Sequence, residues 1–380
     1  MAKNISEFKK CANCGACYNA CPTGAITVSS SGYYYLPQVD SARCTGCGRC
    51  VSVCPVNSPK KVQALQAGYA GYVLNNAVLL QSSSGGAFYA LAQNVLKNGG
   101  VVFGAAFAQN QESVAFCSTN EQPLQKILKS KYVESSVNFS FQQIKQQLTA
   151  GRQVLFCGTP CQAAGLKRYL NRNYENLLVC DFSCGGLVSH KIFKDYLQWL
   201  EEKYGAKAMG VDFRPKSFGW NAHALKVNFA NGRQYLQLAT LDPYYRGFLK
   251  SLTKRDYCYE CDFADNHYAD IILADFWLHK KLSSLENGNK GLSLILTNSK
   301  KGQQAVQQLA GCMQLTPLPL EKAAYNIKSG HQSQQAIVRH QSFMAALEKT
   351  NYNAAVNQFD PLPLHYKIKQ QVRKWVKKVK

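Results

Sequence analysis

The sequence predicts an α/β core with parallel strands, preceded by a small N-terminal α+β domain. Three observations support this prediction. Short apolar runs alternate with helical patterns from residue 101 onward, which is typical of βαβ units. Residues 1–62 hold half of the 16 cysteines, in two runs of equal spacing. A chain of 380 residues is long enough for two or three domains with a real core.

Composition narrows the class of protein. Hydrophobic residues make up 46% and charged residues 17%, a globular balance that excludes a disordered chain. The 44 basic and 22 acidic residues give a net charge of +22, so we expect an anionic cofactor, partner or surface. The first ten residues lack the apolar region of an export signal, so we expect a cytoplasmic protein. Thiols stay reduced there, which favours metal or redox roles for the cysteines.

The first two cysteine runs give the strongest signal. Each reads C-x2-C-x2-C-x3-C-P, and the second repeats the first at a constant offset. In such a duplication each run gives three ligands to one 4Fe-4S cluster and its fourth to the other. Zinc sites use cysteine pairs instead. Residues 1–62 are therefore predicted to form a bacterial-type ferredoxin domain with two clusters, one held by Cys11, Cys14, Cys17 and Cys54, the other by Cys44, Cys47, Cys50 and Cys21.

The other eight cysteines fall into two groups. Four have apolar or small neighbours and are interpreted as core residues: Cys117, Cys157, Cys180 and Cys312. Cys161 and Cys184 each follow a short apolar run, at the sheet edge where ligands bind in α/β proteins. The remaining two form a C-x2-C pair. We hypothesise a third 4Fe-4S cluster on Cys161, Cys184, Cys258 and Cys261; a zinc site or a redox dithiol at the C-x2-C pair are alternatives.

The alternation of short apolar runs with helical patterns predicts the following order of elements. It comprises a strand at 101–107, a helix at 141–150, a strand at 153–157, a helix at 161–170, a strand at 177–180 and a helix at 189–204. Ser140 and Gln143 suggest a capping box, Gly151 a C-cap, and Ser189 an N-cap. A hairpin at 224–239 is expected to turn at Asn231-Gly232 in a type I′ turn and to roof the site.

Two segments are candidates for binding a phosphate group. Residues 81–86 read QSSSGG and precede a helical pattern, so they offer backbone N–H groups at a helix start; a plain N-cap with a glycine turn is the alternative. Lys131 beside Tyr132 suits a phosphate or a flavin ring, and a solvated loop lysine is the alternative. Residues 361–380 are predicted to form a basic amphipathic helix that either binds an anionic membrane or acidic carrier, or packs on the core.

Several segments together resemble a known family. They are QSSSGGAF (81–88), SKYVES (130–135), VLFCGTPCQAAGLKRYL (154–170), ENLLVCDFSCGGLVSHKIFKDYL (175–197) and CYECDFADNHYADIILADFW (258–277). This order resembles the beta subunit family of coenzyme F-420 hydrogenases and dehydrogenases, including stand-alone bacterial members often encoded among polysaccharide genes.

The resemblance implies an FAD and iron–sulfur catalytic domain over residues 63–360. It implies the third cluster on the four cysteines named above. It also implies FAD contacts from Ser82, Ser83, Ser84, Gly85, Gly86, Lys131, Tyr132, Gly158, Thr159, Pro160 and Asp275. It assigns no catalytic residue.

The predicted function is that of an iron–sulfur flavoprotein oxidoreductase. FAD would exchange an electron pair with an unidentified organic substrate, and the clusters would exchange single electrons with an acidic ferredoxin or flavodoxin. The alternatives are a deazaflavin (F-420) dehydrogenase and an electron-input subunit of a larger complex. Nucleic-acid binding is not expected, because no recognition module accompanies the high pI. We expect the cytoplasm or the inner membrane face, and leave a homo-oligomer open.

Overall fold

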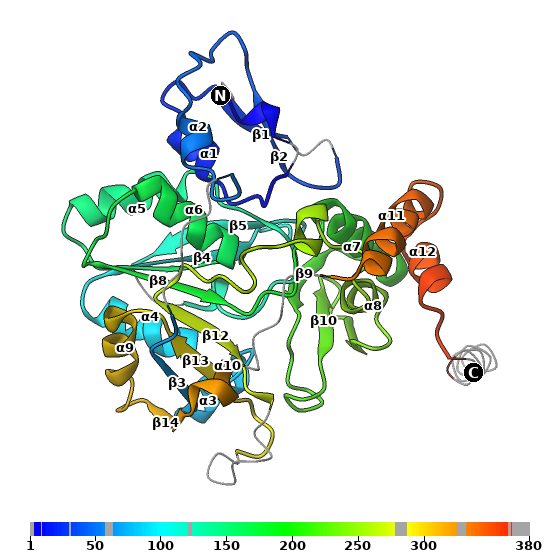
Figure 1. Ribbon diagram of the computed structural model, residues 1–380. Helices are drawn as coiled ribbons and strands as arrows, with labels where there is room; N and C mark the ends of the chain where they lie inside the picture. Colours follow the sequence, from blue (N-terminus) through cyan, green and yellow to red (C-terminus); the bar gives the residue numbers. More distant parts are fainter. Residues whose placement is uncertain are drawn as a thin grey trace.

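The computed structural model describes residues 4–8, 10–29, 32–57, 64–120, 124–277, 287–324, 332–363 and 366. The chain begins with a small cysteine-rich region that lies above the main body (Figure 1). Its elements are η1 (Ile5–Glu7), α1 (Ala16–Ala20), β1 (Ile26–Ser29), β2 (Leu36–Val39) and α2 (Arg49–Ser52). The predicted basic helix at 361–380 lies outside the described residues except for 361–363 and 366.

The duplication predicted from the cysteine runs recurs in the backbone. Gly15 precedes α1 with φ +83°, and Gly48 precedes α2 with φ +70°. Asn13 and Gly46, at the same offset, also have positive φ, +53° and +67°. Such conformations favour glycine, since a Cβ atom crowds the left-handed region. The two halves therefore wrap their cysteines in the same way.

A nine-stranded mixed sheet forms the main body. Its strand order is β14-β3-β13-β12-β8-β7-β4-β5-β6. The bounds are β3 (Ala67–Val73), β4 (Val101–Phe107), β5 (Val114–Thr119), β6 (Ser135–Ser136), β7 (Val154–Cys157), β8 (Leu177–Phe182), β12 (Ile271–Asp275), β13 (Ser293–Thr297) and β14 (Met313–Leu318). Strands β12, β8, β7 and β4 run parallel, as do β5 and β6, and the other pairs are antiparallel. The predicted α/β core with parallel strands is confirmed.

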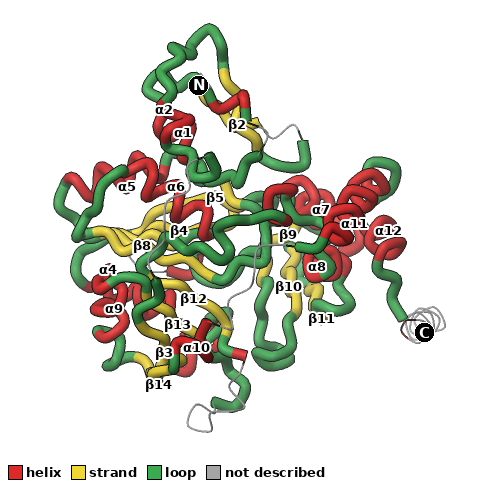
Figure 2. The backbone as a smooth tube through the Cα atoms, viewed as in Figure 1, coloured by secondary structure: helices red, strands yellow, loops and turns green. Residues whose placement is uncertain are grey.

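Helices cover both faces of this sheet (Figures 1 and 2). On one face, α5 (Ser140–Thr149), α6 (Pro160–Leu170) and the cysteine-rich region share an apolar cluster with Phe103, Phe156 and Val179. On the other, α3 (Asn76–Gln81), α4 (Ala87–Lys97) and α9 (Lys300–Gln307) lie over Leu155 and Cys180. The short α10 (Leu320–Ala324) packs against β3. Neighbouring residues of β7 and β8 belong to different clusters, because successive side chains of a strand point to opposite faces of the sheet.

A second lobe is built around aromatic side chains. Its sheet has the order β11-β10-β9, from β9 (Ala208–Asp212), β10 (Ala224–Phe229) and β11 (Gln234–Leu238). Its helices are α7 (His190–Tyr204), α8 (Pro243–Leu249), α11 (Gln334–Leu347) and α12 (Tyr352–Phe359), and the turn η3 (Asp256–Tyr259) packs against α11. The turn η2 (Leu124–Lys126) packs against β4 of the main sheet instead. Buried Asp242 caps α8 and accepts hydrogen bonds from the Tyr196 and Tyr235 hydroxyls, at 2.5 and 2.7 Å.

Most predicted elements are confirmed, and two local details are wrong. Ser189 caps α7 as predicted, accepting from the Ile192 N–H. Helix α5 begins at Ser140 with Phe139 as N-cap, so the Ser140/Gln143 capping box does not form. In the hairpin only Gly232 has positive φ, +78°, whereas a type I′ turn needs two such residues. A Phe229–Gly232 turn followed by a glycine bulge replaces it.

Candidate functional site

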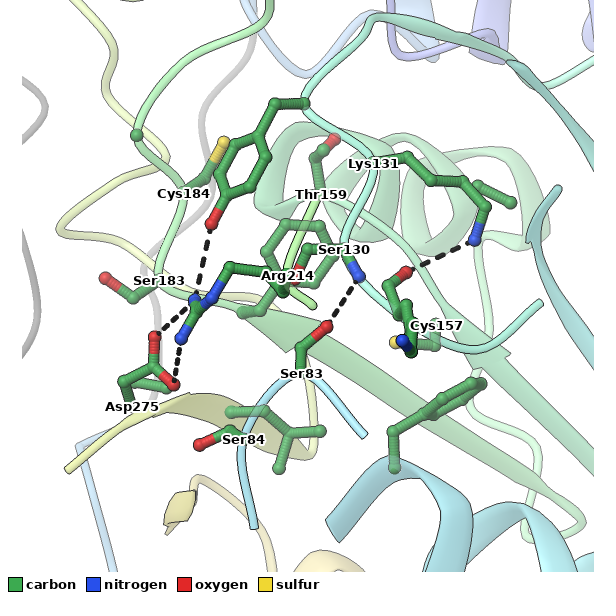
Figure 3. Close-up of a pocket in the computed structure, with 18 of the residues that line it drawn as sticks. Ser83, Ser84, Ser130, Lys131, Cys157, Thr159, Ser183, Cys184, Arg214 and Asp275 are labelled. Atoms are coloured by element: carbon green, nitrogen blue, oxygen red, sulfur yellow. Dashed lines mark hydrogen bonds and ion pairs between the residues drawn. The ribbon is translucent and has the colours of Figure 1, made fainter. Parts of the chain in front are cut away.

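A cavity of about 540 Å³ opens at the carboxyl ends of the central parallel strands. Cys157 at the end of β7, Cys184 just after β8 and Asp275 at the end of β12 all line it (Figure 3). This is the edge at which ligands bind in parallel α/β sheets, as the sequence predicted. The cavity lining includes no residue of the β10 and β11 strands, so the expectation that the hairpin roofs the site is wrong. Helix α8 and the segment after β9 take that place.

The serine loop, residues 82–86, forms one wall of the cavity. Ser82 and Ser84 donate hydrogen bonds to backbone carbonyls, Val78 O and Leu292 O, both at 2.8 Å. These two hydroxyls hold the loop in shape. The Ser83 hydroxyl accepts from the Ser130 N–H at 2.8 Å, which leaves its own proton to donate to a ligand. Ser83 therefore joins two lining loops and faces the cavity (Figure 3).

Both glycines of this loop lie where a side chain would collide with neighbouring atoms. A Cβ atom on Gly85 would lie 2.2 Å from Gly71 O and 2.5 Å from Ser293 N, so Gly85 lies tightly against β3 and β13. Gly86 precedes α4 with φ +87° and lines the cavity. Replacing Gly85 would disturb the sheet first, and so Ser83 and Lys131 are better probes of ligand binding.

Lys131 brings a cation into the lining. Its side chain is half-buried, and its Nζ donates to Leu128 O at 2.7 Å and Lys129 O at 3.2 Å. Burial lowers the pKa of Lys131 to about 8. The alternative of a solvated loop lysine is therefore wrong. The neighbouring Tyr132 also lines the cavity.

Asp275 is tied to residues that sequence reasoning missed. Arg214, which is 5% exposed, binds its carboxylate through Nη1 to Oδ2 at 2.9 Å and Nη2 to Oδ1 at 3.4 Å. The Trp220 Nε1–H also donates to Oδ1, at 3.1 Å. Arg214 Nη1 further contacts the Tyr132 hydroxyl at 3.4 Å. Asp275 thus anchors one end of the cavity, as Figure 3 shows.

Apolar side chains rim the same cavity. Phe182, Leu249 and Trp277 line it while remaining 38%, 48% and 40% exposed. Trp277 stacks on Trp220, with ring centroids 4.6 Å apart and an interplanar angle of 9°. Exposed apolar residues gathered at one opening mark a binding site for an apolar or planar group. Their sequence signal was weak, because a single apolar residue after a strand is common.

Lys216 supports the serine loop from behind. Its Nζ donates to Leu79 O at 2.6 Å, to Ser84 O at 2.8 Å and to Lys290 O. Burial, followed by the charges of Arg214 and Lys129, lowers the pKa of Lys216 to about 7. This lysine was also missed, because nothing in its sequence neighbourhood distinguishes it from a solvated one.

The four cysteines of the hypothesised third cluster lie together beside the cavity. Burial raises the pKa of the Cys161 thiol well above its ordinary value, and the thiols of Cys261, Cys184 and Cys258 raise it further. The Leu187 N–H donates to Cys258 Sγ at 3.4 Å, and Thr159 Oγ1 lies 3.1 Å from Cys161 Sγ. Gly158 and Thr159 line the cavity, and Pro160 begins α6 behind it. Their chemistry fits a 4Fe-4S cluster, which needs four thiolates.

The ferredoxin-type cysteines also gather as the duplication requires. Burial raises the pKa of the Cys14 thiol, and the nearby thiols of Cys54 and Cys17 raise it further. Cys17 is affected in the same way by Cys11 and Cys54. The other four cysteines, Cys21, Cys44, Cys47 and Cys50, line a small cavity of about 20 Å³. In the described part of the chain, no three His, Cys, Asp or Glu side chains form a group that could hold a single metal ion.

The four cysteines interpreted as core residues differ in burial. Cys180 is fully buried, while Cys117 and Cys157 are half-buried. Cys312 is exposed, so the core interpretation is wrong for it. It follows the last turn after α9, where apolar neighbours in sequence do not imply burial.

Comparisons with known proteins agree with this architecture. Residues 151–321 match the family model for the C terminus of the beta subunit of coenzyme F420 hydrogenase/dehydrogenase, and residues 10–58 match the 4Fe-4S dicluster domain. The chain therefore joins a 4Fe-4S dicluster domain to a C-terminal domain of this beta-subunit family. No curated protein matches the chain.

Among solved structures, a similar one belongs to the F420-reducing [NiFe] hydrogenase complex from Methanosarcina barkeri, studied by xenon derivatization. The matching chain is 15% identical, with a TM-score of 0.48, and the match covers 77% of this protein and 95% of that chain. No helix of the described residues is long and apolar enough to cross a membrane.

The dicluster domain packs directly on the beta-subunit domain. Cys161 Sγ lies 3.4 Å from Ala12 O, and a Cβ atom on Gly165 of α6 would lie 3.0 Å from Cys14 Cβ. The absence of a side chain at Gly165 therefore allows α6 to approach the first cysteine set closely. Cys161 is also close enough to add to the raised pKa of the Cys14 thiol, which burial mainly causes.

A buried carboxylate joins the two domains. Glu134 is 0% exposed and contacts His190 Nδ1 at 2.6 Å and Arg255 Nη2 at 3.0 Å. From the dicluster side, Asn13 Nδ2 and the Tyr35 N–H both donate to it at 3.3 Å. Arg255 also donates to Cys11 O at 3.2 Å. Glu134 was missed because its partners come from four distant segments.

Proposed function

We propose that this protein is an iron–sulfur flavoprotein oxidoreductase that passes single electrons from 4Fe-4S clusters to FAD, which reduces an organic substrate. One observation carries the proposal. Cys184 lines the cavity, while Cys161 of the same cysteine quartet lies against the dicluster domain. The two cysteine sets of the dicluster domain and this quartet thus form a series that ends at the cavity wall. Such a series is suited to one-electron transfer, and a flavin converts single electrons into pairs.

The lining supports FAD as the occupant of the cavity. Lys131 and the Ser83 hydroxyl provide a cation and a donor for a phosphate group. Apolar lining residues, including Val114, Phe116 and Ile127, suit an isoalloxazine or adenine ring. The protein would bind and orient the cofactor and exclude water, while FAD supplies the electron-pair chemistry.

The rim supports an organic substrate with an apolar or planar part. Phe182, Leu249 and Trp277 lie at the opening, so a ring entering there contacts them before it reaches the interior. The net charge of +22 favours an acidic ferredoxin or flavodoxin as electron donor.

Anaerobic purification tests the proposal. Iron, sulfide and flavin are counted per chain, and we expect about twelve irons, from four per cluster, with one FAD. Reduced ferredoxin is then added and the flavin absorbance followed; bleaching is expected. A protein without flavin, or one whose flavin stays oxidised while its clusters are reduced, contradicts the proposal.

The matched family model makes a deazaflavin dehydrogenase the second candidate. In that case reduced F420, rather than ferredoxin, would bleach the flavin by hydride transfer. An electron-input subunit would instead accept electrons from ferredoxin and show no substrate turnover on its own. The same titration, repeated with reduced F420, separates these three outcomes.

A further inference from the structure

Two thiols outside the three predicted cluster sets face each other across neighbouring strands. Cys157 ends β7 and is the register partner of Cys180 in the parallel β8. Both side chains belong to the apolar cluster beneath α4, so they leave the same face of the sheet. Cys157 lines the cavity, whereas Cys180 is fully buried behind it.

The geometry of a parallel ladder allows these two residues to be bonded. Neighbouring strands lie about 4.8 Å apart, and disulfides join Cα atoms about 4.4–6.8 Å apart. Burial raises the pKa of the Cys180 thiol, and the neighbouring Cys157 thiol raises it further. The register pairing and the shared face of the sheet therefore place the two thiols side by side.

A cation lies on the same side of the cavity. The Lys131 ammonium interacts electrostatically with the thiols of Cys157 and Cys117. Figure 3 shows Lys131 and Cys157 together, across the cavity from Arg214 and Asp275. Cys117 lacks a thiol opposite it, because its register partner is Gly104.

We propose that Cys157 and Cys180 form a redox-active dithiol that exchanges an electron pair with the flavin in the cavity. This inference rests on the proposed function for its electron acceptor. On oxidation the two S–H groups lose two protons and two electrons, and an S–S bond forms. The two electrons and two protons would pass to an oxidised flavin bound in the cavity. In the reverse direction the disulfide would take up two electrons and two protons from a reduced flavin and open to two thiols.

A redox-active dithiol adds a second carrier of an electron pair to the site. Clusters deliver electrons singly, and the flavin holds one pair. A dithiol beside it stores a second pair inside the protein, and Cys157, which reaches the cavity, is the thiol that could attack a disulfide ligand there. The expected ligand class is therefore a small disulfide or thiol.

The pair is tested by mapping disulfides in the full holoprotein. The protein is equilibrated anaerobically with mixtures of reduced and oxidised dithiothreitol, quenched in acid and alkylated with N-ethylmaleimide. Trypsin leaves Cys157 in residues 153–167 and Cys180 in residues 173–191. We expect these peptides to become linked in oxidising buffer. Each of these peptides also contains a predicted cluster ligand, Cys161 or Cys184. Fragmentation must therefore show that the N-ethylmaleimide label is on Cys161 and Cys184. A disulfide between those two residues would report cluster loss and overturn the inference.

Variants provide the controls. C157S should abolish the linked peptide, whereas C117S, which removes the other thiol near Lys131, and C312S, which removes an exposed one, should leave it unchanged. C157S should also lower the reductive capacity of the holoprotein by one electron pair. If C157S fails to fold, the wild-type peptide map still decides.

The two proposals fail in different ways. A protein without flavin contradicts the proposed function, yet its peptide map still reports on the thiol pair. If the flavin is present and reducible, but no buffer yields the Cys157–Cys180 link, the pair is a core contact and this inference is wrong. A linked peptide without any loss of reductive capacity in C157S shows a disulfide that exchanges no electrons with the flavin, which also overturns it.

Discussion

At the scale of single residues, Lys131 brings to the cavity lining a positive charge that titrates near neutral pH. Burial lowers its pKa to about 8, so the ammonium form predominates below that pH and is lost above it. An anionic ligand is attracted by the charged form alone. FAD affinity should therefore fall as the pH rises through about 8, by roughly tenfold over two pH units. Flavin fluorescence titrations measure the Kd, and the Lys131→Met variant should bind more weakly at pH 7 with no such dependence. An equal dependence in the variant would assign the titration to another group.

The cysteine quartet gives a second prediction at this scale. Cys258→Ser removes one of four thiolates, so the third cluster should be lost while the dicluster domain keeps both of its clusters. Iron should drop from about twelve to about eight per chain. Cys312→Ser, at an exposed site, is the matched control and should keep all iron. Unchanged iron in Cys258→Ser would show that this thiol is not a ligand.

The predicted residues and the missed ones differ in how they are brought to the site. Cys161, Ser83 and Lys131 could be predicted because each belongs to a local pattern, a helix start for the first two and a neighbouring tyrosine for Lys131. Arg214 and Lys216 could not, because their roles depend on partners far along the chain, Asp275 and Leu79. Only the folded chain determines such contacts.

At the scale of elements, α6 sets the distance between two cysteine sets. Its Gly165 faces Cys14 so closely that a Cβ atom would lie 3.1 Å from the sulfur. Gly165→Leu should therefore push the dicluster domain away from α6. We expect slower reduction of the flavin by ferredoxin with the iron content kept, as measured by stopped-flow absorbance. Gly311→Leu, where a Cβ atom meets open space, is the control. An unchanged rate in Gly165→Leu would mean that electrons do not cross at this contact.

Elements were more predictable than the details of their ends. The apolar run at 101–107 coincides with β4, and the parallel order of β4, β7 and β8 follows from alternation with helices. The antiparallel strands β3, β13 and β14 were not predicted, because their pairing joins segments more than 200 residues apart in the sequence. The hairpin turn failed for a local reason, since Asn-Gly fits both a type I′ turn and a turn with a bulge.

At the scale of the whole molecule, Glu134 stabilises the interface between the dicluster domain and the rest of the chain. Glu134→Ala leaves Arg255 buried without its carboxylate, which should lower the free energy of unfolding by on the order of 3–5 kcal/mol. Thermal melting under anaerobic conditions measures the loss. Asp195→Ala breaks an exposed ion pair with Lys191 and should cost less than about 1 kcal/mol. Equal Tm shifts in the two variants would show that the Glu134 contacts do not stabilise the domain interface.

The position of β3 has a consequence for how the protein is synthesised. Gly71 pairs with Ser293 on one side and Leu315 on the other, so β3 leaves the ribosome long before either neighbour exists. At ordinary translation speeds that interval is roughly ten seconds or longer. The dicluster domain has already been synthesised and can acquire iron and sulfide during this time. Both edges of β3 meanwhile lack their partner strands. Its glycines, Gly68 and Gly71, weaken premature pairing with other nascent chains, and later they let β14 and α10 approach closely.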